Sequence, residues 1–103
     1  MNVNEAKEVI DQEGLGPYTL FEGKVFADGI VIKKDQAGWL TYATSERGGL
    51  AGEIARFESE SAALDNFIER LRAQREMQEI QKQRRARRRA EREEQRRAEG
   101  QSE

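Results

Sequence analysis

Residues 29–44 read GIVIKKDQAGWLTYAT and contain two β-favouring runs that are separated by a short polar segment. Gly29–Lys34 includes three consecutive β-branched residues, and Trp39–Thr44 is rich in aromatic and β-branched residues. Residues of these types are enriched in strands. Asp35–Gly38 lies between the two runs and has the composition of a hairpin loop. The stretch therefore predicts two neighbouring antiparallel strands.

A further strand and a helix are predicted on the C-terminal side of this hairpin. Residues 45–52 contain three glycines and are predicted to form a loop. Glu53–Phe57 alternates in polarity and predicts a strand, in which the facing of Ile54 stays open. Ser59 or Ser61 is expected to cap the helix that follows. Its apolar residues recur at helical spacing and form one stripe, which consists of Leu64, Phe67, Ile68 and Leu71.

A short amphipathic helix and another strand are predicted on the N-terminal side. Asn4–Glu13 places its apolar residues on one stripe, with Asn4 as N-cap and Gly14 in the left-handed position that ends the helix. Tyr18–Glu22 is the next strand, and Val25–Ala27 either extends it or forms a short second one. The whole pattern predicts an α+β fold, a small antiparallel sheet of three or four strands flanked by an N-terminal helix and a long C-terminal helix.

The distribution of charge divides the chain near Arg72. Residues 1–72 hold nearly all the large apolar side chains and carry 13 acidic and 8 basic residues, a net charge of −5. Residues 73–103 carry 7 acidic and 10 basic residues, a net charge of +3. This second part consists almost wholly of strong helix formers. We predict a compact α+β domain over residues 1–72 and a charged, Arg/Glu-rich tail over residues 73–103 that is helical or disordered.

The residue types that the chain lacks argue against catalysis. It has no Cys and no His, which removes thiolate and imidazole metal ligands, Cys nucleophiles and the commonest general base. No phosphate-binding loop, dinucleotide fingerprint or nucleophile elbow is present. We therefore expect no enzyme, no cofactor, no metal and no small-molecule substrate. The sequence shows no signal peptide and no apolar run of transmembrane length, so we expect a cytoplasmic protein that does not bind membranes.

The second strand of the hairpin and the loop after it form the first candidate site for binding a macromolecule. Trp39 and Tyr42 should point to opposite faces of their strand, so one can lie in the core while the other faces outward. A core position for both also stays open. An exposed aromatic residue near the polar Glu46 and Arg47 would make an interface anchor. These four residues are the candidate partner-binding site.

The tail contains the second candidate. Residues 82–89 concentrate basic side chains that suit nucleic-acid phosphates, although glutamates follow at once and no aromatic residue is interleaved for base stacking. A solvated helix is the simpler interpretation. The alternative function is a small nucleic-acid-associated protein, and a third is a structural adaptor whose long helix docks into a partner assembly. The nucleic-acid contacts would be Lys82, Arg84, Arg85, Arg87, Arg88 and Arg89.

Two segments resemble small immunity proteins of bacterial polymorphic toxin systems. Residues 39–48 show the pattern W-x-x-Y-x-T-x-E-R-G, and residues 57–71 show F-x-S-E-x-x-A-L-x-x-F-I-x-R-L. The nearest group is immunity protein family fifty-nine, and the resemblance covers roughly residues 4–72 and none of the Arg-rich tail. It implies a cytoplasmic antidote that binds one cognate toxin domain and neutralises it by steric occlusion. An acidic domain would suit a basic toxin surface, such as that of a nuclease.

Overall fold

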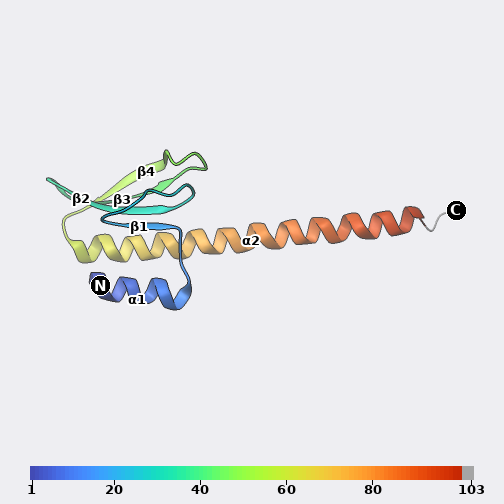
Figure 1. Ribbon diagram of the computed structural model, residues 1–103, viewed down its shortest axis with the longest axis horizontal. Coiled ribbons are helices and arrows are strands. Elements are labelled where there is room, and N and C mark those ends of the chain that lie inside the picture. Colours follow the sequence, from blue (N-terminus) through green and yellow to red (C-terminus); the bar gives the residue numbers. More distant parts are fainter. Residues whose placement is uncertain (101–103) are drawn as a thin grey trace.

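Residues 1–100, which the computed structural model describes, form two helices and one four-stranded sheet (Figure 1). Side chains are described as far as Ala98. The predicted α+β fold, with an N-terminal helix and a long C-terminal helix beside a small sheet, is confirmed. The elements are α1 (Val3–Glu13), β1 (Tyr18–Leu20), β2 (Ile30–Asp35), β3 (Gly38–Thr44), β4 (Leu50–Phe57) and α2 (Glu60–Gly100).

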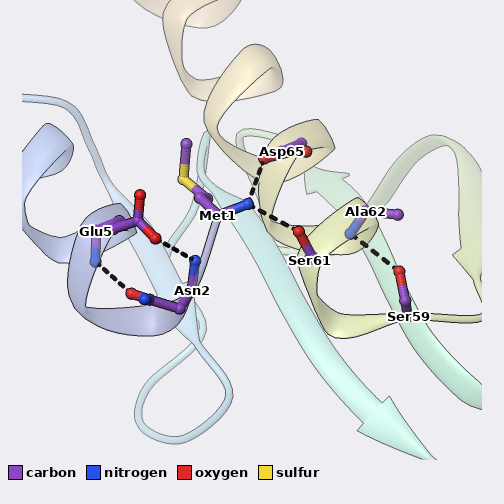
Figure 2. A network of polar contacts seen from close by, with 7 residues as sticks. All are labelled: Met1, Asn2, Glu5, Ser59, Ser61, Ala62 and Asp65. Carbon is purple, nitrogen blue, oxygen red and sulfur yellow. Dashed lines mark hydrogen bonds and ion pairs between the residues drawn. The ribbon is translucent and has the colours of Figure 1, made fainter.

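A capping box at Asn2 starts α1. The Asn2 side-chain oxygen accepts a hydrogen bond from the Glu5 amide at 2.8 Å, and the Glu5 carboxylate accepts one from the Asn2 amide at 3.2 Å (Figure 2). The predicted cap at Asn4 is wrong, because α1 already begins at Val3 and Asn4 lies within its first turn. Glu5 completes the box with Asn2, whereas the residue three positions after Asn4 is Lys7, which has no acceptor. Gly14 ends the helix with φ at 62°, as predicted.

Ser59 caps the start of α2. Its hydroxyl oxygen accepts a hydrogen bond from the Ala62 amide at 3.2 Å, which selects Ser59 from the two predicted caps (Figure 2). The Ser61 hydroxyl instead accepts a hydrogen bond from the Met1 amino group at 2.8 Å. The same amino group lies 2.9 Å from a carboxylate oxygen of Asp65. These contacts join the start of α1 to the first turns of α2.

The sheet has the strand order β1-β2-β3-β4 and is mixed, so the prediction of a wholly antiparallel sheet is wrong. β1 pairs with β2 in parallel, whereas the β2–β3 and β3–β4 pairs are antiparallel. β1 ends at Leu20, because Phe21 adopts a left-handed conformation with φ at 65°. Residues 21–29 then return the chain to the end of the sheet where β1 began. Val25–Ala27 belongs to this connection, so neither of the strands predicted there forms.

The connection between β1 and β2 covers part of the sheet face that is turned away from the helices. The hydroxyl of Thr19 donates a hydrogen bond to the Lys24 carbonyl at 2.7 Å, and that of Thr44 donates one to the Phe26 carbonyl at 2.6 Å. Val31 lies on this face in register with Thr19 and is only 1% exposed. The β1–β2 half of the face is therefore closed.

A close approach at one end of β3 and a strand pairing at the other end fix β3 beside β4. Gly38 has φ at 132°, and a Cβ at this position would lie 2.7 Å from the Phe57 carbonyl oxygen, so only glycine fits. At the other end of β3, Thr44 pairs with Leu50. Leu50–Gly52, which were predicted to be part of a loop, therefore belong to β4, because the turn needs only residues 45–49.

The core lies between α2 and the sheet, and Figure 1 shows α2 between the sheet and α1. The Tyr18 ring contacts the Phe67 ring edge-on, with centroids 6.3 Å apart. The buried Thr41 hydroxyl donates a hydrogen bond to the Asn66 side-chain oxygen at 2.7 Å. The predicted apolar stripe of α2 is confirmed, because none of its members is more than 1% exposed: Leu64, Phe67, Ile68 and Leu71.

α2 continues far beyond the body, which we define as residues 1–72. Gln74 still contacts the body by donating a hydrogen bond to the Asp28 carbonyl oxygen. From Arg75 to Ala98 every side chain is exposed, and we call residues 75–100 the projecting helix. The tail is thus helical up to Gly100, and residues 101–103 lie outside the described part. Within residues 1–100, no helix is apolar over a length that would cross a membrane.

Candidate protein-binding surface

The two candidate aromatic residues lie on opposite faces of β3. Trp39 is on the side of the helices, where it packs against the core beside Phe57. The Lys34 ammonium nitrogen lies 5.0 Å from the centroid of the Trp39 ring. Tyr42 is on the other side, in register with Val31 of β2. The structure therefore makes Trp39 a residue of the core edge and leaves Tyr42 as the outward-facing aromatic residue.

The outer sheet face is exposed toward β4, beyond the part near Thr44 that the connection covers, and we call this exposed part the open face. The pairing of Leu40 with Arg56 and of Thr44 with Leu50 defines its register. Leu50 is 55% exposed, and Ile54 is 45% exposed. A cluster of exposed apolar side chains marks an interaction surface more often than an ordinary solvated one. The open face consists of Leu40, Tyr42, Leu50, Ile54 and Arg56.

Leu50 and Ile54 are the two residues of the open face that the sequence pattern does not identify as binding residues. The pattern assigns Leu50 to a loop and leaves the facing of Ile54 open. The reason is a register shift between β3 and β4. Thr41 pairs with Ala55 and Ala43 pairs with Ala51, so more residues lie between the two pairs in β4 than in β3. Simple alternation does not reveal such a bulge. Gly52, with φ at 79°, is the signal that could have located it.

An ion pair borders the open face. One guanidinium nitrogen of Arg56 donates a hydrogen bond to a carboxylate oxygen of Asp35 at 2.8 Å, and both side chains are partly exposed. This hydrogen bond holds the pKa of Asp35 below its ordinary value, against a smaller opposing effect of burial, and the Ala37 amide lowers it further. The pair gives the apolar face a polar border, which is the usual composition of a protein interface.

Replacement of Arg56 by glutamine should change how the stability of the body depends on pH. A lowered folded-state pKa means that Asp35 stabilises the fold fully above the pKa of an unfolded aspartate, about 3.9, and loses this effect as the pH falls through the folded value. The free-energy difference between wild type and Arg56→Gln should therefore be constant above about pH 5 and shrink below about pH 4. Urea unfolding followed by Trp39 fluorescence measures this difference.

Arg47→Gln is the matched control for this experiment, because it removes the same charge from an exposed arginine of the body. Its free-energy difference from wild type should show no comparable change between pH 5 and pH 3. An Arg56→Gln difference that stays constant over the whole range would contradict the role of the Asp35–Arg56 pair.

Glu46 lies away from the open face, over the start of the projecting helix. It lines a hollow of about 340 Å³ together with Asp28, Met77 and Arg85, among others. Arg47 is exposed in the same turn. Trp39 lies near the opposite end of β3 from this turn. The four predicted partner-binding residues are therefore not brought together, and Tyr42 alone lies on the open face.

A hollow with a volume of about 600 Å³ lies among the end of α1, β1 and the connection that follows. Leu15, Pro17, Tyr18 and Phe26 contribute apolar surface to it, and the charged groups on its lining include Lys7. Within residues 1–98, no three carboxylate side chains come close enough together to hold a metal ion. The hollow therefore combines apolar surface with charged groups at its lining.

The basic residues of the alternative site all lie on the projecting helix but point to different sides of it. At 3.6 residues per turn, Arg84 and Arg87 point away from the other four residues. Arg92 and Arg96, which lie beyond the predicted segment, continue the row that these other four residues form. Four of the six predicted residues fall within one arc of about 120°, namely Lys82, Arg85, Arg88 and Arg89.

Two exposed surfaces thus differ from an ordinary solvated surface, the apolar open face and one basic side of the projecting helix. The open face offers apolar contact area, and the basic side of the projecting helix offers positive charge. The chain matches no protein-family model, no curated protein and no solved structure at a significant level.

Proposed function

We propose that the protein is a bacterial immunity protein that binds a cognate toxin domain in the cytoplasm and neutralises it by steric occlusion. The open face is the observation that supports this function best. Leu50 and Ile54 are largely exposed there beside Tyr42, on a sheet face that the helices leave uncovered. Residues 39–48, one of the two segments that resemble immunity proteins, include all of β3 except Gly38 and so carry Tyr42.

The composition of the open face suits a protein partner. An aromatic side chain stands among aliphatic ones, and the Asp35–Arg56 ion pair lies at the border. Interfaces have this arrangement of an apolar centre and a polar rim, and tyrosine is among the residues that contribute most to binding energy. β4 is also an edge strand, so a partner strand can extend the sheet by pairing with its outer side.

The charge of the body favours a basic partner. Residues 1–72 carry a net charge of −5, and acidic side chains outnumber basic ones by 13 to 8. Charge of opposite sign on two proteins increases their rate of association and excludes partners of like charge. A toxin domain that itself binds nucleic-acid phosphates, such as a nuclease, has the complementary sign.

Expression of the protein together with the product of the adjacent upstream gene tests this function directly. We expect that product to arrest growth when expressed alone, to be harmless when co-expressed, and to co-purify with this chain. The proposal fails if the adjacent product is harmless by itself, or if it is toxic and this chain neither binds it nor restores growth.

Leu50→Asp should weaken toxin binding by at least about tenfold, because it places a charge in the apolar part of the open face. Met77→Asp is the matched control. Met77 is 56% exposed and Leu50 is 55% exposed, but Met77 lies on the projecting helix. Calorimetric titration of the toxin domain into each variant gives the two affinities. Equal affinities for the two variants would place the binding site elsewhere.

A further inference from the structure

The projecting helix is charged on one side. Six basic residues between positions 82 and 96 fall within an arc of about 120°, and no acidic residue between these positions falls inside that arc. Glu93 lies at its edge and lines one hollow of about 180 Å³ with Arg89, Arg92 and Arg96, so these three arginines share one side. We call the row the basic stripe, and its members are Lys82, Arg85, Arg88, Arg89, Arg92 and Arg96.

The basic stripe is unfavourable for the helix by itself. Its members include the pairs Arg85/Arg89, Arg88/Arg92 and Arg92/Arg96, and like charges four residues apart destabilise a helix. All six side chains are exposed, and within residues 1–98 no ion pair joins any of them to an acidic side chain. An anionic partner lying along the row would offset this repulsion.

The length of the row fits a polyanion with closely spaced charges. From Lys82 to Arg96 the helix rises about 21 Å, and double-stranded DNA carries one phosphate charge per roughly 1.7 Å of its axis. Residues 75–103 contain no aromatic side chain, so they lack the stacking platforms with which proteins hold single strands. A straight row of cations without aromatic residues suits a duplex.

The opposite side of the helix determines how a duplex can lie. Glu91 and Glu94 are on that side, and in a groove they would face the second wall of phosphates. The helix therefore suits the outer phosphate ridges of B-DNA, which carry no base sequence to read. In A-form RNA, proteins recognise the duplex largely by its shape and by contacts to 2′-hydroxyl groups and phosphates across the minor groove. The members of the basic stripe supply only hydrogen-bond donors, so they offer no acceptor for the proton of a 2′-hydroxyl group.

We infer that the basic stripe of the projecting helix binds the phosphate backbone of double-stranded DNA without sequence preference. The stripe begins at Lys82, about 10 Å along the projecting helix from Arg75, and helical rise places its last arginines about 30 Å beyond Gln74. The negative body repels DNA, so the contact is confined to the projecting helix. This binding does not depend on a toxin partner, because the open face lies on the body.

Two triple variants of the full chain test this inference with equal loss of charge. Arg89→Gln, Arg92→Gln and Arg96→Gln remove three members of the stripe, whereas Arg84→Gln, Arg87→Gln and Arg97→Gln remove three arginines from other sides of the same helix. Glutamine and arginine have similar helix propensities. The probe is a fluorescently labelled 24-base-pair DNA of mixed sequence, and anisotropy is measured between 50 and 200 mM salt.

Six phosphate contacts predict a slope of about −5 for the logarithm of affinity against that of salt concentration, which is a loss of about 10³-fold over this range. The stripe variant should lose about three units of that slope and at least tenfold in affinity at 50 mM salt, with the control variant close to wild type. Absence of DNA binding at 50 mM salt, or equal losses in the two variants, would overturn the inference. Equal or tighter binding of a duplex RNA of the same length would overturn the choice of DNA.

Discussion

Replacement of Phe67 by alanine is expected to destabilise the body by about 3–5 kcal/mol. Phe67 is 0% exposed, lies at the centre of the α2 stripe and contacts the Tyr18 ring edge-on. Truncation of a buried phenylalanine costs about 3–5 kcal/mol. A body of 72 residues has an unfolding free energy of roughly 4–11 kcal/mol, so the loss is a large fraction of its stability. Urea unfolding of wild type and variant gives the difference.

The measurement has to follow the body and not the projecting helix, whose helical signal does not depend on the core. Trp39 is the single tryptophan of the chain and packs against the core, so its fluorescence reports the body. Met77→Ala is the control on the same helix, because Met77 is 56% exposed, and its effect should stay within about 0.5 kcal/mol. A wild-type transition for Phe67→Ala would show that α2 is not packed on the sheet.

The parts of the fold that follow from local periodicity are predictable from the sequence. The hairpin of β2 and β3 follows from two runs of β-favouring residues, and the apolar stripe of α2 follows from helical spacing of its apolar residues. Burial of the stripe is confirmed. The direction of β1 has no such signal. It depends on how residues 21–29 cross the sheet, which the left-handed Phe21 and the hydrogen bond from Thr19 to the Lys24 carbonyl determine. These are tertiary properties, so the parallel pairing is visible only in the structure.

The candidate sites also combine features that local periodicity predicts with features that only the tertiary structure shows. Alternation in β3 predicts that Trp39 and Tyr42 lie on opposite faces, but only the position of α2 shows which face is covered. Leu50 joins the open face through strand pairing with Thr44 across a bulged hairpin. The basic stripe is different, because helical spacing alone places its members on one side. The basic segment at residues 82–89 does not identify the stripe by itself. It combines residues from several sides of the helix and omits Arg92 and Arg96.

If the proposed function holds, Tyr42→Ala is expected to have the largest effect on toxin binding. Tyr42 is the aromatic residue of the open face. It is the cross-strand neighbour of the buried Val31, so the sheet fixes the position of its ring. Aromatic anchors at the centre of an interface typically contribute 2 kcal/mol or more, which corresponds to a loss of roughly 30-fold in affinity. Calorimetric titration with the toxin domain measures this loss.

The effect on binding must be separated from an effect on the fold. A cross-strand pair such as Tyr42 with Val31 contributes about 0.2–1 kcal/mol to sheet stability, so Tyr42→Ala should leave the body folded. Tyr42→Phe keeps the ring and removes only the hydroxyl. If the ring is the anchor, the phenylalanine variant keeps most of the affinity and the alanine variant does not. Wild-type affinity in a folded Tyr42→Ala variant would instead remove the open face from the binding site, and with it the structural basis for occlusion through this sheet.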